Sequence, residues 1–261
     1  MTTFPDGPSL AAPTRPLYYV LSAGRTGTMF LETLIRRHCP DVHVEHEPSP
    51  SRSLMILGNI RNDCGLFGAR TRRLSRSHQE TFHGRDGQCI EVNPFLCAVT
   101  DLLPLSTRPL RIVHVVREPG AWAQSMTTFK ASSRYRHVID YVPFSKPFPA
   151  PRPDGWPKLT PFEKSLHQWI WCNNRIAALA GEAEEYVQVR SEDIFSSDRT
   201  VRNATLTRIF RVLDLPIQAE TLATDEFSQR VNPAPAGTNL RDAAVERAIC
   251  GHAATEFGYD I

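Results

Sequence analysis

A turn with two glycines separates the first apolar run of the chain from its first helical pattern. The run Leu17–Leu21 is typical of a buried parallel strand, and apolar side chains recur at helical spacing from Phe30 onward. A turn between such a strand and helix directs backbone amides and the helix dipole at an anion, and an arginine in it adds a full positive charge. The turn therefore predicts a phosphate site. Its candidate residues are Gly24, Arg25, Thr26, Gly27 and Thr28.

This turn differs from the loop of the ordinary ATPases and kinases. Their pattern, G-x-x-x-x-G-K-S/T, separates the glycines by four residues and places a lysine after the second. Here only two residues separate Gly24 from Gly27, and no lysine follows. The spacing disfavours Mg–ATP chemistry and leaves phosphate binding open. The alternative is a tight turn whose glycines serve only the backbone.

A second group of residues has the types and order of an anion site. Arg117 follows the strongest strand pattern, Arg111–Val116, and Ser125 lies eight residues later in the helix that begins near Ala121. An arginine at a strand end and a serine in the first turns of the next helix can converge on one anion. The alternative is an arginine paired with a carboxylate and a serine without a special role. Together the two groups describe a nucleotide with phosphates at both ends of its ribose.

The two turns resemble the signatures of the sulfotransferases that use 3′-phosphoadenosine 5′-phosphosulfate (PAPS). In that family the first loop holds the 5′-phosphosulfate, and an R-x-P turn with a later serine, matched by Arg117, Pro119 and Ser125, holds the 3′-phosphate. The segment Arg190–Ile194 is similar to the family's R-x-E-D-L segment. The resemblance implies a three-layer, P-loop-like α/β fold, PAPS as co-substrate and no metal. It also implies that Arg25 stabilises the leaving phosphate.

Sulfuryl transfer also needs a base to deprotonate the acceptor. A weak strand pattern near Val44 ends in His46-Glu47-Pro48, and open α/β sheets bind ligands at such strand ends. The heparan-type sulfotransferases use a glutamate about twenty residues past the loop, and Glu47 lies 22 residues after Arg25. His46 is the alternative base, because a neutral imidazole is common near pH 7. A purely structural role for both is the remaining alternative.

Two further segments offer contacts to the acceptor. Asn93 lies where similar enzymes have an E-K-S/T-P segment, so the resemblance implies a polar contact there. Seven of the 21 prolines lie between Pro143 and Pro161, together with Trp156, which predicts irregular structure. We expect residues 130–161 to form a lid on the acceptor side, with Trp156 touching the substrate. The alternative is a surface loop held by buried aromatic rings.

The elements that must position these residues alternate along the chain. Short apolar runs and helical patterns follow one another without a repeat, which predicts an α/β fold with a mainly parallel central sheet and helices on both faces. Residues 1–16 are polar and proline-rich, so we expect a disordered lead, with one domain over residues 17–261. The predicted strands lie at 17–21, 42–44, 89–92, 111–116 and 186–189, and a helix is predicted at 95–103.

The composition is that of an ordinary water-soluble protein. Hydrophobic residues make up 41% and charged residues 22% of 261 residues, and no apolar run is long enough to cross a bilayer. We expect a cytoplasmic protein without stable membrane insertion. The net charge of +2 does not indicate a nucleic-acid partner, although 26 of the 30 basic residues are arginine. Six of these arginines form a basic stretch in which we favour a solvated face over an anion-steering surface: Arg61, Arg70, Arg72, Arg73, Arg76 and Arg85.

The sequence therefore predicts a PAPS-dependent sulfotransferase whose acceptor is a small molecule, a carbohydrate or a lipid-like alcohol. The six cysteines lack the spacing of a zinc site, which agrees with a reaction that needs no metal. Two alternatives stay open. The first is a phosphotransferase with a nonstandard phosphate loop, and the second is a protein that binds PAPS or its product without catalysis.

Overall fold

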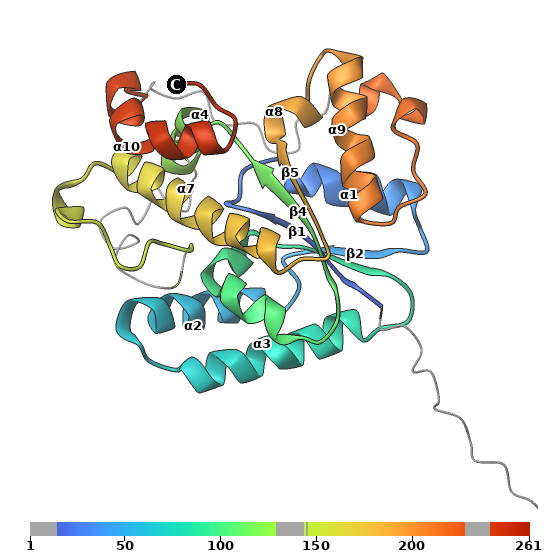
Figure 1. The fold of residues 1–261 in the computed structure, drawn as a ribbon, viewed down its shortest axis with the longest axis horizontal. Coiled ribbons are helices and arrows are strands. Elements are labelled where there is room, and N and C mark those ends of the chain that lie inside the picture. Colours follow the sequence, from blue (N-terminus) through green and yellow to red (C-terminus); the bar gives the residue numbers. More distant parts are fainter. Residues whose placement is uncertain (1–14, 129–143, 145, 228–240) are drawn as a thin grey trace, which may run out of the picture.

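The computed structural model describes residues 15–128, 144, 146–227 and 241–261, and within them five strands form one sheet (Figure 1). The strand order is β2-β3-β1-β4-β5 and every neighbouring pair is parallel. This confirms the predicted α/β class and the parallel sheet. The strands are β1 (Leu17–Ser22), β2 (His43–His46), β3 (Cys89–Val92), β4 (Leu110–Val116) and β5 (Glu185–Arg190).

A strand that is buried along its whole length is easier to predict from sequence than an exposed one. β1 lies at the centre of the sheet, where β3 and β4 cover its edges and helices cover both faces, so all six of its residues are buried. Such a strand has an uninterrupted apolar run. In contrast, β2 is an edge strand in which only Val44 is buried, and its sequence pattern is correspondingly weak.

Helices cover both faces of the sheet, as predicted, and they enclose two separate cores (Figure 1). On one face lie α1 (Thr28–His38), α8 (Ser191–Ile194) and α9 (Arg199–Val212). On the other lie α2 (Ser51–Cys64), α3 (Gly68–His83), α4 (Pro119–Thr128), α7 (Pro161–Ala177) and α10 (Ala243–Glu256). The 3-10 helices are η1 (Pro94–Leu105), η2 (Trp156–Lys158), η3 (Ala178–Gly181), η4 (Ala219–Thr221) and η5 (Thr224–Phe227).

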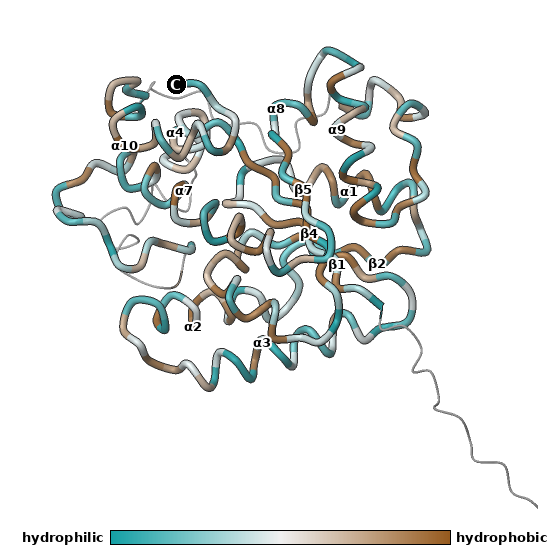
Figure 2. Tube along the Cα trace, in the orientation of Figure 1, coloured by the Kyte–Doolittle hydropathy of each residue, from teal (hydrophilic) through white to brown (hydrophobic). Residues whose placement is uncertain are grey.

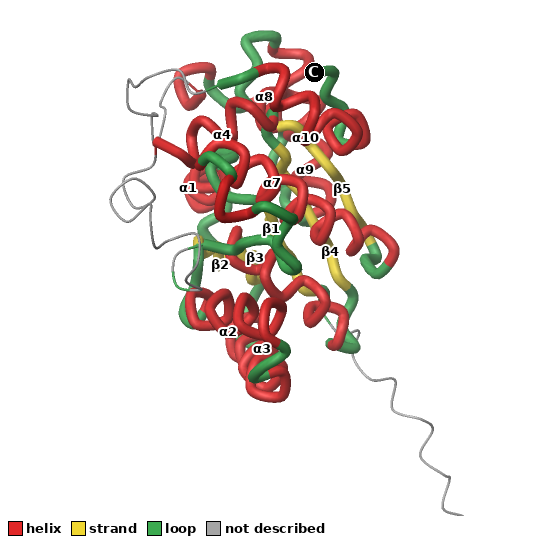
Figure 3. The backbone as a smooth tube through the Cα atoms, turned by 90° about the vertical axis from the view of Figure 1, so that its left-hand side faces the viewer, coloured by secondary structure: helices red, strands yellow, loops and turns green. Residues whose placement is uncertain are grey.

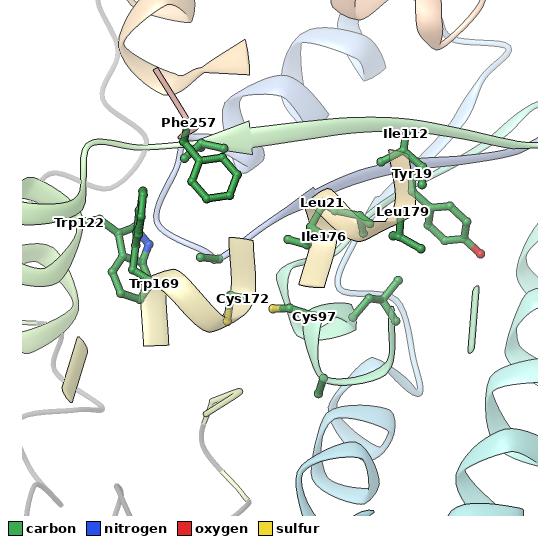
Figure 4. Close-up of a cluster of buried hydrophobic side chains, with 14 of the residues drawn as sticks. Tyr19, Leu21, Cys97, Ile112, Trp122, Trp169, Cys172, Ile176, Leu179 and Phe257 are labelled. Carbon is green, nitrogen blue, oxygen red and sulfur yellow. The ribbon is translucent and has the colours of Figure 1, made fainter. Parts of the chain in front are cut away.

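The larger core joins the central strands to α4, α7 and the C-terminal helix. Figure 4 shows Trp122, Trp169 and Phe257 gathered at one end of this core, with Tyr19 and Leu179 at the other. The rings of Trp169 and Phe257 meet edge to face, with centroids 5.4 Å apart. These rings pack α4, α7 and α10 against the carboxyl ends of the strands, which is where the predicted site residues lie.

One prediction about local structure is wrong in the type of helix, and two others extend beyond the described residues. The helix predicted at 95–103 is a 3-10 helix over Pro94–Leu105, because it contains Pro104 and leaves helical geometry at Val99. The proline-rich segment is irregular where it is described, apart from η2. Residues 130–143 of the predicted lid, and residues 1–14 of the predicted lead, lie outside the described residues. In the described part of the chain, no helix has both the length and the apolar character to cross a membrane.

A buried carboxylate ties β3 to α3 beneath the sheet. Glu91 is fully buried, and both of its carboxylate oxygens lie within 3.0 Å of His78 Nε2. His83 Nε2 lies 3.7 Å from the same carboxylate. Burial alone would raise the pKa of Glu91, but the hydrogen bond from His78 and the nearby His83 lower it to about 2. The carboxylate is therefore ionised, and its partners hold α3 in place.

We expect Glu91→Gln to lower the free energy of unfolding at pH 7 by about 2–3 kcal/mol, the contribution of a charged hydrogen bond. Because the folded-state pKa lies below that of the unfolded chain, this stabilisation is complete above about pH 4.5 and is lost as the pH falls toward 2. Urea unfolding of wild type and variant from pH 7 to pH 3 measures the difference. Glu80→Gln, on the exposed side of α3, is the control. A difference independent of pH would contradict the role of the charge.

Candidate functional site

The turn between β1 and α1 lies at the carboxyl end of the central strand. The chain runs from β1 to β2 on one side, returns through β3, and then adds β4 on the other side. In open α/β sheets the ligand site lies outside the carboxyl ends of the strands at such a reversal of strand order. Figure 3 views the molecule from the side toward which the strands run, with α1, α4 and α7 around this edge.

The backbone of this turn is unusual at three of its residues. Gly24, Arg25 and Gly27 have φ angles of 83°, 56° and 86°, in the left-handed region that side chains disfavour. At Gly27 the Cβ of any other residue would lie 2.5 Å from the ring of Phe195, so a side chain there requires that ring to move in addition to the strained φ. A non-glycine residue held in this region, as Arg25 is, marks strain that the surrounding structure must sustain.

Three side chains from other parts of the chain donate hydrogen bonds to carbonyl groups of the turn, and these contacts fix three successive peptide planes. In addition, the first backbone amides of α1 have no acceptor within their own helix. Backbone amides arranged in this way, next to two arginines, form the kind of nest that can bind an anion. The three contacts are Trp122 Nε1 to Gly24 O at 2.6 Å, Arg117 Nη1 to Arg25 O at 2.9 Å, and Ser191 Oγ to Thr26 O at 2.9 Å.

The residues of the two predicted anion sites lie together. Arg25 Nε donates to Ser125 Oγ at 3.2 Å, and Arg117 contacts the backbone of Arg25. Partial burial, together with the positive charge of Arg117, lowers the pKa of Arg25. Two guanidinium groups therefore share one region of positive potential, next to the serine hydroxyl.

Thr26 provides a direct test of whether this region fits an anion. Its side chain is 1% exposed, and its Oγ1 has no hydrogen-bond partner among the described residues. Buried hydroxyl groups nearly always have a partner. An anion oxygen at the turn would supply one, so the chemistry of the nest fits a phosphate or sulfate group.

The N-terminus of α4 is closed by carboxylates of the protein itself. Glu246 is buried and accepts from Gly120 N at 3.0 Å, while Glu118 accepts from Ala121 N at 2.6 Å. Arg241 pairs with both carboxylates. The first amides of α4 are thus occupied by carboxylates of the protein. The side chains of Arg117 and Ser125 also lie near this strand end and are the residues predicted for a second anion.

The two candidate bases lie beside the turn. His46 Nε2 lies 3.5 Å from Thr28 Oγ1, and His46 Nδ1 lies 3.9 Å from Glu47 Oε1. Burial lowers the pKa of His46, which keeps its imidazole neutral near pH 7. Burial raises the pKa of Glu47, and the charge of Arg52 offsets part of this rise. Both groups are therefore able to accept a proton next to the anion nest.

Comparison with known proteins rests on structure alone. No family model matches the chain, and no curated protein matches its sequence. A sulfotransferase domain from the olefin synthase of Synechococcus PCC 7002 has 16% identity and a TM-score of 0.54, covering 97% of this chain and 98% of that domain. A sulfotransferase domain from the curacin biosynthetic pathway has 12% identity and a TM-score of 0.52, covering 96% of this chain and 100% of that domain. The chain has the sulfotransferase fold. This confirms the fold that the resemblance implied.

Within this sulfotransferase fold, two predicted substrate residues have internal partners. Asn93 is fully buried, and its Nδ2 donates to Ser51 Oγ and to Glu91 Oε1, each at 2.6 Å, while its Oδ1 accepts from Phe95 N. Trp156 is 4% exposed and has Lys164 Nζ 5.7 Å from its ring centroid. These contacts hold both side chains inside the protein, and their contact with a substrate stays a prediction.

Sequence reasoning missed the residues that support the turn after β1. Nothing in the local sequence marks Trp122, Ser191 or Phe195 as contacts of residues 24–27, because they lie about 100 or more positions away. The sequence does show the proline-glycine turn after Arg117. It does not show that Glu246, in the C-terminal helix α10, accepts a hydrogen bond from the first turn of α4.

We expect Gly27→Ala to lower the free energy of unfolding by about 2–4 kcal/mol, since the left-handed backbone and the contact with Phe195 both oppose a side chain. Gly65→Ala is the matched control: Gly65 has a φ of 69° but nothing within 4 Å of its Cβ position. We expect it to cost only about 1 kcal/mol. Urea unfolding followed by tryptophan fluorescence measures both. Equal losses would show that Phe195 does not constrain the turn.

Proposed function

We propose that the chain transfers a sulfuryl group from PAPS to a hydroxyl of a small-molecule, carbohydrate or lipid-like acceptor. The observation that carries this proposal is the meeting of Arg25, Ser125 and Arg117 at the turn after β1. The turn offers amides and a buried hydroxyl to one anionic group, and Arg117 with Ser125 offers a second position nearby. A nucleotide with both 5′ and 3′ phosphates matches this pair of positions.

The residues of the chain divide the work of such a reaction between two strand ends. Bound PAPS supplies the sulfuryl group, which passes to the acceptor oxygen and leaves 3′,5′-adenosine bisphosphate and a sulfate ester. Arg25 and the amides of the turn stabilise negative charge on the departing phosphate oxygen. At the end of β2, Glu47 accepts the proton of the acceptor hydroxyl. We assign the proton to Glu47 because both ring nitrogens of His46 face protein groups.

Nucleotide binding tests the site without any knowledge of the acceptor. We expect calorimetric titration to give at least about tenfold tighter binding for 3′,5′-adenosine bisphosphate than for 5′-AMP, because the 3′-phosphate adds charged hydrogen bonds. Arg117→Ala should remove this difference. Arg208→Ala, an exposed arginine on α9, should leave it unchanged. A preference for ATP–Mg²⁺, or equal affinities in wild type and Arg117→Ala, would instead favour a phosphotransferase.

If Glu47 is the base, its substitution should lower turnover but leave nucleotide affinity nearly unchanged. With PAPS and a model alcohol found by screening, we expect Glu47→Gln to lower kcat by about 10²–10⁴-fold while bisphosphate affinity stays within about threefold. In wild type, kcat should rise with pH as Glu47 loses its proton, with an apparent pKa above the usual glutamate value.

The pH profile of a second variant decides between the two bases. The pKa of Glu47 is raised and that of His46 is lowered. These shifts oppose the usual difference between the two groups, so the wild-type profile alone does not identify the base. In His46→Asn the rise of kcat with pH should persist. If the rise disappears in His46→Asn and remains in Glu47→Gln, His46 is the base. Bisphosphate binding with no turnover on any alcohol would favour the non-catalytic alternative.

A further inference from the structure

The corner between α2 and α3 presents two large apolar side chains to solvent. Leu66 is 55% exposed and Phe67 is 50% exposed, although most residues of their type in this chain are buried. Phe67 has a φ of 60°, which a bulky side chain rarely adopts. Single exposed apolar residues need no explanation, but an adjacent pair at a projecting corner does. Figure 2 shows this apolar corner at the end of a helix whose outer side is hydrophilic.

The exposed face of α3 next to this corner is strongly basic. Thr71, Ser75 and His78 mark the buried side of the helix, and no acidic residue occurs before Glu80. Four arginines lie on the outer side, all of them exposed and, within the described residues, without an ion-pair or hydrogen-bond partner. They are Arg70, Arg72, Arg73 and Arg76.

Other arginines in this part of the molecule do have carboxylate partners. Arg61 Nη2 lies 2.7 Å from Asp101, and Arg152 Nη1 lies 2.7 Å from Asp63. The positive charge of the corner is therefore concentrated on α3. It borders a hollow of about 380 Å³ between α3 and the segment before β4, lined in part by Arg72, Arg76, Ser106 and Thr107.

We propose that this corner binds the surface of an anionic membrane. Leu66 and Phe67 enter the boundary between headgroups and acyl chains, and the arginines of α3 pair with lipid phosphates. The combination favours a membrane over other polyanions. A nucleic acid would satisfy the arginines but offers no apolar phase to Leu66, and a partner protein would need a recess to receive a projecting corner. This is adsorption to a surface, and it involves no spanning helix.

The corner lies apart from the candidate site. Figure 1 shows it at the lower left, where α2 and α3 cover one face of the sheet, whereas β4 points to the upper left. The binding inference itself does not depend on the proposed reaction, because it concerns only the surface of α2 and α3.

Flotation with vesicles tests the proposal on the whole chain. We expect binding to phosphatidylcholine vesicles that contain about 30% phosphatidylglycerol and little binding to phosphatidylcholine alone. Arg70→Gln with Arg73→Gln should weaken binding by about tenfold or more. The matched control is Arg208→Gln with Arg211→Gln, which removes two arginines at the same spacing from α9 and should have little effect.

The apolar pair is tested separately from the charge. Leu66→Ser with Phe67→Asn keeps a residue that tolerates the left-handed backbone, and it should weaken vesicle binding several-fold. Val201→Ser, an exposed apolar residue on α9, should not. Urea unfolding that matches wild type shows that each variant is folded. Because this control needs no nucleotide binding, it separates failure of this proposal from failure of the proposed reaction.

Three outcomes would overturn the membrane proposal. The first is the absence of wild-type binding to anionic vesicles. The second is an equal effect of the α3 and α9 arginine pairs, which would reveal a general charge effect. The third is binding to single-stranded RNA that requires the arginines but not Leu66 and Phe67, together with no vesicle binding, which would assign the face to nucleic acid.

Discussion

The candidate site depends on the fixation of three successive carbonyl groups in the turn after β1. Their donors, Trp122, Arg117 and Ser191, lie 92 to 165 residues away along the chain. A short turn with left-handed residues is unstable by itself, so these contacts must supply the energy that holds it. The turn takes its form only when β4, α4 and α8 are in place. The form of the turn is thus a property of the assembled sheet and not of the turn's own sequence.

The charges at the N-terminus of α4 are arranged differently from those at the turn after β1. At the N-terminus of α4, Glu118 and Glu246 accept from the first amides, and Arg241 pairs with both carboxylates. At the turn, in contrast, burial and the charge of Arg117 lower the pKa of Arg25. Two like charges held close together repel one another. In the proposed reaction, a bound anion would offset this repulsion.

Local patterns predicted the fold well where burial is continuous along the chain. The apolar runs of β1 and β4 predicted their strands because both faces of a central parallel strand are covered. Residue types at fixed spacing led to the prediction that the residues of the two turns lie together, and Arg25, Ser125 and Arg117 do meet. Their binding of anions stays a prediction. Residue type and position did not reveal the internal partners of Asn93, such as Ser51. Helical spacing likewise did not show that residues 94–105 form a 3-10 helix.

Asn93 links the two strand ends that carry the proposed site residues. Its backbone N donates to Val20 O of the central strand, and its side chain holds Ser51, whose hydroxyl donates to Pro48 O beside Glu47. Arg25 keeps its charge across the physiological range, so in the proposed reaction proton transfer falls to another group, and Glu47 lies on a different strand end. The contacts of Asn93 join the strand before Arg25 to the segment that carries Glu47. They therefore help to fix the separation between these two residues.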